Sequence, residues 1–478
     1  MTTLVWFRHD LRINDNPALF EAVARGRILP VFIRETPEQS GEDHPLGGAS
    51  NWWLHHSLAA LKKSLPGLVL LKGCARHLIP ALAKDTGVEA VYWNRGYEPH
   101  VVERDADIKN MLKSEGFEAR SFKANLLFEP WEMKTGTGGP FKVYSPFWRA
   151  MQKLGVQQPL PAPGQIEFIS GHDGVDLDQF DLLPEAPNWA ARWNDIWDPG
   201  ETGAEERLTA FLSTGLEDYG DLRNRPDLPK VSRLSPHLHF GEISPRRIWH
   251  ETLLHVGKAE SLRADAMKFL SEIAWREFSS HLLFHFPKLP SENWRPAFDA
   301  YPWRNHPADL ENWQKGQTGY PIVDAGMREL WQTGYVHNRV RMIVASFLVK
   351  HLRLHWYHGE AWFRDTLVDA DLANNSASWQ WVTGSGADAA PYFRVFNPIS
   401  QGQKFDPNGA YIRKWVPELK DLETAFLFAP FDAPSDVLTR AGVELGENYP
   451  HPIVDHAAAR KAALEGYSAV KEAGQNAA

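Results

Sequence analysis

Residues 369–398 read DADLANNSASWQWVTGSGADAAPYFRVFNP, and the rest of the sequence is organised around this stretch. It combines three aspartates, three asparagines and two tryptophans. A polar group buried beside an aromatic ring must find a partner or costs about 1–3 kcal/mol. The stretch is therefore either a polar surface loop with a few core aromatics or a binding site, and the remaining sequence must decide between the two.

The composition is that of a globular protein with more than one domain. At 478 residues, 43% hydrophobic and 23% charged, the chain is too long for one core, and two or three domains are expected. The net charge of −9 excludes a polycation, although a local basic surface is enough to bind nucleic acid. The single cysteine, Cys74, excludes an intramolecular disulfide. With no signal-peptide pattern and no long apolar run, we expect a cytoplasmic protein without a membrane segment.

Short β-rich runs alternate with helical patterns over the first 125 residues. The runs lie at 3–7, 28–33, 68–72, 89–93 and 117–122, with helices predicted at 49–65, 75–86 and 100–115. This alternation predicts an α/β fold with a doubly wound parallel sheet. After residue 204 the pattern is helical, with predicted helices at 204–216, 236–256, 258–285, 323–333, 336–350 and 359–367. We predict an α/β domain at 1–130, an interdomain linker at 131–200 and an all-α domain at 201–478.

Two of the predicted helices carry chemically unusual faces. Glu272, Trp275 and Arg276 follow one another at i, i+3 and i+4, so they share a helix face that could both stack on and hydrogen-bond a flat heterocycle. Asn338 and Arg341 share a face in the same way, at the start of a strongly apolar run. Solvated surface groups are the alternative interpretation for both helices.

A third segment, KVSRLSPHLHFGEISP at 230–245, begins a predicted helix with Ser235 and Pro236. Serine and proline at a helix start satisfy backbone donors and leave an N-terminus that can hold phosphate oxygens. Taken alone, this pattern is more typical of an ordinary helix cap.

Five segments together resemble the photolyase/cryptochrome flavoproteins. They are WFRHDLRINDNPAL, SRLSPHL, SEIAWREF, GYPIVDAGMRELWQTGYVHNRVRM and the long stretch that begins at Asp369. They keep the order of that family over essentially the whole chain. The block NNSASWQWVTGSGADAAPYFR is most similar to microbial cyclobutane pyrimidine dimer photolyases, in particular the third class, which is nearest to plant cryptochromes.

The resemblance implies a light-dependent DNA repair enzyme, a carbon–carbon lyase. In this family excited, reduced FAD passes an electron to a flipped-out cyclobutane pyrimidine dimer and splits it to monomers, without a metal. The FAD-binding positions that the resemblance implies are Tyr219, Arg223, Ser232, Leu234, Ser235, Arg276, Asn338, Arg341, Asp369, Asp371 and Asn375. Val231 stands where the family often has threonine, so one hydroxyl contact to phosphate is not expected.

Asn375 matches the residue that faces the redox-active nitrogen of the flavin, where plant cryptochromes tend to carry aspartate. An amide cannot supply a proton as an acid can, which favours full photoreduction and repair. Trp379, Trp356 and Trp303 match the family's electron-transfer chain, and Glu272 matches the carboxyl group that assists the splitting. The alternative function is that of a cryptochrome, which senses blue light through flavin photoreduction without repair.

The same resemblance implies a substrate pocket and a DNA-binding rim. The implied substrate and DNA contacts are Glu272, Trp275, Asn338, Arg339, Met342, Trp381 and Arg394, with Arg223, Arg225 and Lys404 as further members of the basic rim. The expected partner is DNA that contains a dimer, bound by a monomer.

An antenna chromophore is expected in the N-terminal domain. Many folate-binding members of the family have an Asn-Glu pair after the fourth strand, where this chain has His100 and Val101. We therefore expect methenyltetrahydrofolate at another place in the domain, with deazaflavin or a second flavin as alternatives.

Overall fold

The fold is described from a computed structural model, which describes residues 1–478 except 258, 390–392 and 477–478. These residues form two compact units. The first unit comprises Met1–Tyr219, Val231–Pro287 and Val368–Ala373, and the second comprises Gly220–Lys230, Lys288–Leu367 and Asn374–Ala478. The first unit thus contains the sheet together with part of the helical sequence, and the domain boundaries at 130 and 200 remain a prediction.

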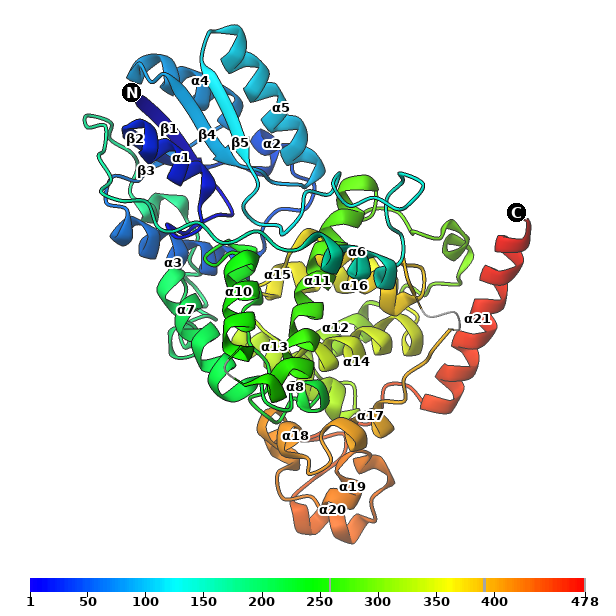
Figure 1. The fold of residues 1–478 in the computed structure, drawn as a ribbon. Coiled ribbons are helices and arrows are strands. Elements are labelled where there is room, and N and C mark those ends of the chain that lie inside the picture. Colours follow the sequence, from blue (N-terminus) through cyan, green and yellow to red (C-terminus); the bar gives the residue numbers. More distant parts are fainter. Residues whose placement is uncertain (258, 390–392, 477–478) are drawn as a thin grey trace. The chain divides into compact units, whose positions relative to one another are not determined.

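The N-terminal sheet confirms the α/β prediction. Its five strands are all parallel, in the order β3-β2-β1-β4-β5 (Figure 1). They are β1 (Thr2–Phe7), β2 (Arg27–Arg34), β3 (Val69–Lys72), β4 (Ala90–Asn94) and β5 (Glu118–Phe122). The connecting helices are α1 (Pro17–Arg25), α2 (Pro37–Ser40), α3 (Gly48–Ser64), α4 (Ala75–Thr86) and α5 (Pro99–Ser114). Each strand lies within about one residue of its predicted position, because apolar strands buried on both faces give unbroken runs in the sequence.

Alternation of side chains along the strands decides which helices cover each face of the sheet. Leu4 and Trp6 of β1 share a buried core with Ile79 of α4 and Ile108 of α5. Right-handed crossovers in a sheet of this order place α1 and α3 on the opposite face. The sheet is therefore covered on both faces, as a doubly wound fold requires.

The rest of the chain is helical, as predicted. The first unit continues with α6 (Tyr144–Leu154), η1 (Leu177–Phe180), η2 (Trp193–Asp195), α7 (Glu201–Ala210), η3 (Phe211–Gly215), α9 (Ser235–His239), α10 (Pro245–Val256), η4 (Glu260–Leu262) and α11 (Arg263–His285). The boundary between the units falls within α8 (Tyr219–Leu222) and α16 (Leu372–Thr383). The second unit contains η5 (Pro296–Ala300), α12 (Pro307–Lys315), α13 (Pro321–Thr333), α14 (Asn338–Ser346), η6 (Phe347–His351), α15 (Trp356–Thr366), α17 (Pro398–Phe405), α18 (Ala410–Trp415), η7 (Pro417–Leu419), α19 (Thr424–Leu427), η8 (Pro430–Asp432), α20 (Ser435–Ala441) and α21 (His456–Asn476). No helix within the described ranges is long and apolar enough to cross a bilayer.

The single helix predicted at 236–256 is wrong, because the chain breaks there into α9 and α10. Gly241 lies between them with φ of +66°, a conformation that favours glycine. A Cβ atom at Gly241 would lie 2.1 Å from the carbonyl oxygen of His9. Ser244 then caps α10 by accepting a hydrogen bond from the backbone N–H of Arg247 at 3.0 Å. The predicted linker at 131–200 also contains a regular helix, α6.

A buried guanidinium group explains why the chain approaches itself so closely at Gly241. Arg12 is 1% exposed and donates to the carbonyl oxygen of Gly241 at 2.7 Å, to Asn125 Oδ1 at 2.9 Å and to the carbonyl oxygen of Asp15 at 2.9 Å. The Asp15 carboxylate pairs with Arg246 at 2.7 Å. A buried charge is tolerated only when its hydrogen bonds are satisfied, and these partners satisfy it. The loop after β1 is thereby fixed to the segment between α9 and α10.

We predict that Gly241→Ala destabilises the protein much more than Gly442→Ala does. Both glycines have positive φ, +66° and +68°, but a Cβ atom at Gly442 would meet nothing within 4 Å. The change at Gly442 should lower the free energy of unfolding by about 1 kcal/mol, and the change at Gly241 by about 3 kcal/mol or more. Urea unfolding measures both values, and equal losses would show that the contact with His9 has no energetic role.

Candidate active site

The residues expected to hold the flavin fall into both compact units. Tyr219, Ser232, Leu234, Ser235, Arg276, Asp369 and Asp371 belong to the first unit, and Arg223, Asn338, Arg341 and Asn375 to the second. Within the first unit the Ser235 hydroxyl donates to Asp369 Oδ2 at 2.5 Å, which joins the start of α9 to the segment before α16. Arg276 donates to the carbonyl oxygen of Asn125 at 2.8 Å. The structure thus brings together sequence segments that are more than a hundred residues apart.

Helix α11 presents Glu272 and Trp275 on one face, as the spacing predicts. The Glu272 carboxylate forms an ion pair with Lys268, 3.1 Å away and one turn earlier. The indole ring of Trp275 is stacked on the ring of Tyr144, with centroids 3.7 Å apart and planes inclined by 7°. Both Glu272 and Trp275 remain partly exposed. Nothing in the sequence indicated Tyr144, because it lies in the segment predicted as a linker.

Asn375 is held by a neighbour that the sequence did not indicate. Its amide nitrogen donates to the Glu360 side chain at 2.9 Å and to the Glu360 carbonyl oxygen at 3.1 Å. An asparagine amide carries two N–H groups, and both are now used. The atom that Asn375 can offer to a ligand is therefore its carbonyl oxygen, a hydrogen-bond acceptor. Burial raises the pKa of Glu360, which favours the protonated carboxyl.

The three tryptophans of the expected electron-transfer chain all belong to the second unit, and two of them meet α15. Trp356 is the first residue of this helix, and its indole N–H donates to Asn293 Oδ1 at 2.9 Å. Gly359 lies one turn later and contacts Trp379, since a Cβ atom there would be 2.1 Å from the indole ring. His355, the N-cap residue of α15, has its ring 4.8 Å from that of Trp303 and 5.7 Å from that of Trp356. The three tryptophans therefore lie in α15 or next to α15 and its N-cap residue.

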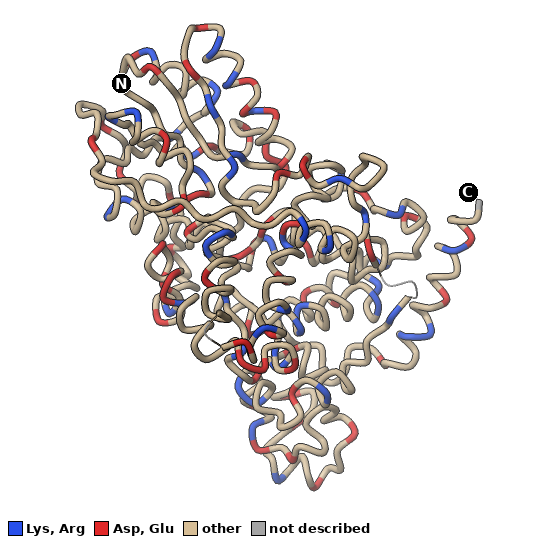
Figure 2. The backbone as a smooth tube through the Cα atoms, in the orientation of Figure 1, with Lys and Arg blue, Asp and Glu red and all other residues tan. Residues whose placement is uncertain are grey.

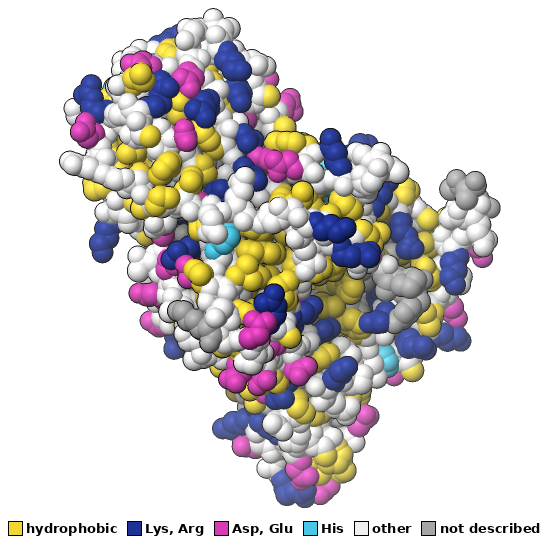
Figure 3. Space-filling model, in the orientation of Figure 1, with side chains coloured by type: hydrophobic (Ala, Val, Ile, Leu, Met, Phe, Trp, Pro, Cys, Tyr) yellow, Lys and Arg dark blue, Asp and Glu magenta, His cyan; other side chains and the backbone are white. Residues whose placement is uncertain are grey.

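The expected DNA contacts of the second unit have defined partners within it. Arg339 donates to Asn224 Oδ1 at 2.8 Å and lies over the ring of Phe405 at 4.5 Å. The indole N–H of Trp381 donates to the carbonyl oxygen of Asp388 at 3.1 Å. Basic and acidic residues alternate along both units (Figure 2), and basic side chains lie among acidic and apolar ones on the face drawn in Figure 3. These partners hold the side chains that are expected to bind DNA.

Arg394 is supported by a buried lysine. Lys350, in η6, is 3% exposed, and its ammonium group donates to the carbonyl oxygen of Arg394 at 2.7 Å. The same ammonium group lies 4.1 Å from the centre of the Phe393 ring. Burial and the nearby charge of Arg394 lower the pKa of Lys350 to about 7.

The first unit encloses a cavity of about 180 Å³ at the carboxyl ends of β1, β2 and β4. Parallel α/β sheets bind ligands at this edge, where the strand order reverses. The apolar part of its wall consists of Phe32, Leu46, Leu54, Leu126 and Leu283, and its polar part includes Arg8, His9, Glu98, His100, His239, Arg276 and Asp371. His239 is 6% exposed, and neither of its ring nitrogens has a hydrogen-bond partner in the described part of the chain. His239 Nδ1 lies 3.9 Å from Asp371 Oδ2, which belongs to the same wall.

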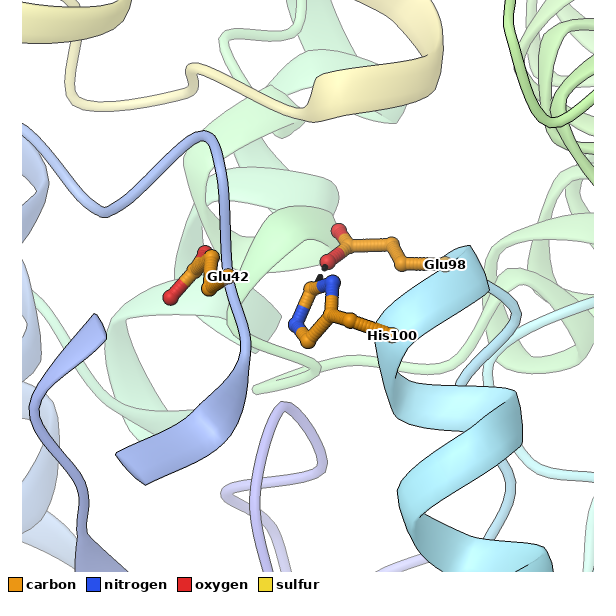
Figure 4. Close-up of side chains that lie close together, drawn as sticks. All are labelled: Glu42, Glu98 and His100. Carbon is orange, nitrogen blue, oxygen red and sulfur yellow. Dashed lines mark ion pairs between the residues drawn. The ribbon is translucent and has the colours of Figure 1, made fainter. Parts of the chain in front are cut away.

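Burial shifts the pKa values of three side chains that line the cavity. It lowers the pKa of His9 to about 3 and that of His100 to about 4, and it raises the pKa of Glu98 to about 8. The neighbouring carboxylate of Glu42 adds to the shift at Glu98. Figure 4 shows Glu98 and His100 projecting from the start of α5, with Glu42 on the opposite chain segment. Their possible ligand atoms lie within 4.8 Å of one another, and His100 Nε2 is 3.7 Å from Glu98 Oε2.

Asn375 offers an acceptor that fits an FAD molecule. Glu360 uses its amide hydrogens, so its carbonyl oxygen can accept from an N–H group of the FAD ring. The Ser376 hydroxyl and the Trp379 indole N–H are enclosed by protein and line no open site within the described residues.

A parallel α/β unit followed by helices that gather polar side chains and tryptophans agrees with the flavoprotein class that the sequence resembles. Comparison with known proteins gives the family. Residues 3–164 match the family described as "DNA photolyase", and residues 269–469 match "FAD binding domain of DNA photolyase". The chain belongs to the photolyase/cryptochrome family.

The most similar relatives extend over nearly the whole chain. A deoxyribodipyrimidine photo-lyase from Agrobacterium fabrum is 50% identical over 479 residues, with 98% of each chain covered. Cryptochrome-1 from Arabidopsis thaliana is 38% identical, covering 96% of this chain and 69% of the cryptochrome. The solved structure of a bacterial class III photolyase from Agrobacterium tumefaciens matches with a TM-score of 0.94 at 50% identity, again with 98% of each chain covered.

We predict that Lys350→Met changes the pH dependence of stability. Because the pKa of Lys350 is lowered, the folded protein releases a proton above about pH 7 that the unfolded chain keeps up to the ordinary lysine pKa. The free energy of unfolding should therefore rise by about 1–3 kcal/mol more in the wild type than in the variant between pH 7 and roughly pH 9.5. Urea unfolding at the two pH values measures this difference, and parallel pH profiles would contradict it.

Proposed function

We infer that this protein is a deoxyribodipyrimidine photo-lyase that repairs cyclobutane pyrimidine dimers in DNA under blue or near-ultraviolet light. The observation that carries this function is the 50% identity to a photo-lyase over 98% of both chains, against 38% to a cryptochrome. Asn375 supports the same choice, since it offers an amide oxygen and no acidic proton toward the flavin. We place the protein in the third class of these enzymes and expect it to act as a cytoplasmic monomer on DNA that contains a dimer.

Bound FAD supplies the light-driven electron transfer that opens the cyclobutane ring. The residues that would hold it are those named above, with Asn375 oriented by Glu360. These side chains bind and orient the cofactor, and the apolar helices around them exclude water.

Trp275 and Glu272 are the residues that would contact the pyrimidine dimer. The partly exposed indole can stack on a pyrimidine that has left the duplex, which contributes about 1–3 kcal/mol for each stacked base. Glu272 is paired with Lys268 when no DNA is bound, so its carboxylate is an acceptor in that state. Donation of a hydrogen bond to a dimer carbonyl requires that this pair opens and that the carboxyl group takes up a proton. Lys268 is therefore a competitor that binding must displace.

Trp303, Trp356 and Trp379 conduct electrons from the protein surface to the buried site. The contact of Gly359 with Trp379 and the ring pairs at His355 support this role, because they bring the three indoles to one helix. Arg339 and Arg394 bind the DNA backbone as parts of a basic rim, together with Arg223, Arg225 and Lys404. Met342 and Asn338, both in the first turns of α14, are the further proposed contacts of the second unit with the substrate.

The proposed antenna is methenyltetrahydrofolate, with deazaflavin or a second flavin as alternatives, held in the first unit. The cavity at the carboxyl ends of β1, β2 and β4 contains His100, so it is a place for deazaflavin or a second flavin, and methenyltetrahydrofolate would bind elsewhere in the unit. The lining of this cavity fits the edge of a planar heterocycle that has both N–H and C=O groups. Release of bound chromophores from the purified protein, followed by separation and absorption spectra, identifies which of the three is present.

We predict that the purified protein with a reductant restores intact thymines in an oligonucleotide containing one thymine cyclobutane dimer, in light and not in darkness. Trp275→Ala should weaken binding of this oligonucleotide by about 5- to 150-fold. The combined change Glu272→Ala and Trp275→Ala should abolish repair. If bound flavin is photoreduced and no dimer is split, the protein is a blue-light sensor instead.

We further predict that Trp379→Phe slows photoreduction of oxidised flavin by about tenfold or more. Bleaching of the flavin absorbance under blue light with an external thiol measures the rate. Trp331→Phe is the matched control, because Trp331 is 52% exposed and lies outside the proposed chain. Equal rates in the two variants would exclude Trp379 as the first electron donor.

A further inference from the structure

Trp275 is braced from one side by a tyrosine that begins α6. The Tyr144 ring lies 3.7 Å from the indole ring and only 7° from parallel. Its hydroxyl donates to the backbone carbonyl oxygen of Ser271 at 2.6 Å. Ser271 lies one turn before Trp275 on α11, so the tyrosine is held by the same helix that carries the indole. Tyr144 is 8% exposed whereas Trp275 stays partly exposed, so one indole face is covered and the residue is not enclosed.

The tyrosine is itself fixed by the packing of α6 on α11 (Figure 1). Phe278 meets the rings of both Tyr144 and Trp275 nearly edge-on, at 5.9 Å in each case. Phe147, one turn after Tyr144, contacts Phe278 at 5.3 Å and His281 at 5.3 Å. The stacked pair thus rests on a buried aromatic cluster and has little freedom to rotate.

We propose that Tyr144 is a positioning residue for dimer recognition, which holds the Trp275 ring in the orientation that stacks on the flipped pyrimidine. This inference rests on the proposed function. A freely rotating indole would lose conformational freedom when it binds a base, and a ring that is already clamped loses much less. The hydroxyl bond to Ser271 sets the plane of the tyrosine, and the tyrosine sets the plane of the indole. Binding of the lesion then forms a continuous stack of pyrimidine, Trp275 and Tyr144.

If Tyr144 acts through Trp275, changes at Tyr144 should weaken the binding of DNA that contains a dimer and leave the binding of undamaged DNA unchanged. Tyr144→Leu should raise the Kd for an oligonucleotide with one thymine dimer about tenfold and leave the Kd for the undamaged oligonucleotide unchanged. Tyr144→Phe keeps the ring and removes only the hydroxyl, and it should raise the Kd for the dimer about threefold. At saturating substrate the repair rate of both variants should stay within about twofold of wild type, so that the effect appears in KM and not in kcat.

A double-mutant cycle with Trp275→Ala, measured by fluorescence anisotropy, is the decisive experiment. If Tyr144 acts through Trp275, Tyr144→Leu changes dimer binding less than twofold when Trp275 is already alanine. Leu154→Ala is the matched control, since Leu154 lies at the other end of α6 and is 59% exposed, and it should leave the preference for the dimer unchanged. An equal loss in both Trp275 backgrounds, or an equal loss for undamaged DNA, would overturn the inference.

The outcomes separate the inference from the proposed function. If the wild type neither prefers nor repairs the dimer, the proposed function fails. If the wild type repairs the dimer and Tyr144→Phe and Tyr144→Leu bind it as tightly as wild type, only the role of Tyr144 fails.

Discussion

The guanidinium group of Arg12 is the constraint on which the first unit depends. Arg12 lies in the loop after β1. Its guanidinium group is almost fully buried and donates to the backbone carbonyl oxygens of Gly241 and Asp15. The adjacent backbone N–H of Leu11 donates to the carbonyl oxygen of Phe240 at 3.1 Å. A charge in this position cannot be removed from its partners without a large desolvation cost, so α9 is fixed relative to the sheet. His239 in the cavity and Ser235 beside Asp369 both lie on α9 and are placed by this link.

In the candidate site, several residues that are expected to contact a ligand are held in place by a second residue that is not expected to contact it. Glu360 uses both amide hydrogens of Asn375 and so decides which atom the asparagine presents. Lys350 holds the backbone at Arg394, and Tyr144 covers one face of Trp275. Such partners fix the geometry of the site before a ligand arrives, which lowers the cost of ordering it on binding.

The sequence was most informative where local pattern decides structure. The five strands were predicted because their runs are apolar on both faces, and Glu272 was placed beside Trp275 because helical spacing is regular. The break at Gly241 was missed, since its cause is the carbonyl oxygen of His9, which is 232 residues earlier in the chain. The proximity of Trp303, Trp356 and Trp379 to α15 likewise depends on packing. Glu360 carried no pattern, because its contact with Asn375 comes from packing and not from spacing.

Helix α6 has a consequence for how this fold can be divided. Its residues, 144–154, lie inside the segment 131–200 that composition predicts to be a linker between two domains. They nevertheless support Trp275 on α11 through Tyr144. A recombination event between homologous genes that joined a foreign N-terminal half at residues 155–200 would exchange Tyr144 without exchanging Trp275. Such a chimaera would keep the indole and lose the tyrosine that covers one of its faces, so the orientation of Trp275 would depend on which parent supplied α6.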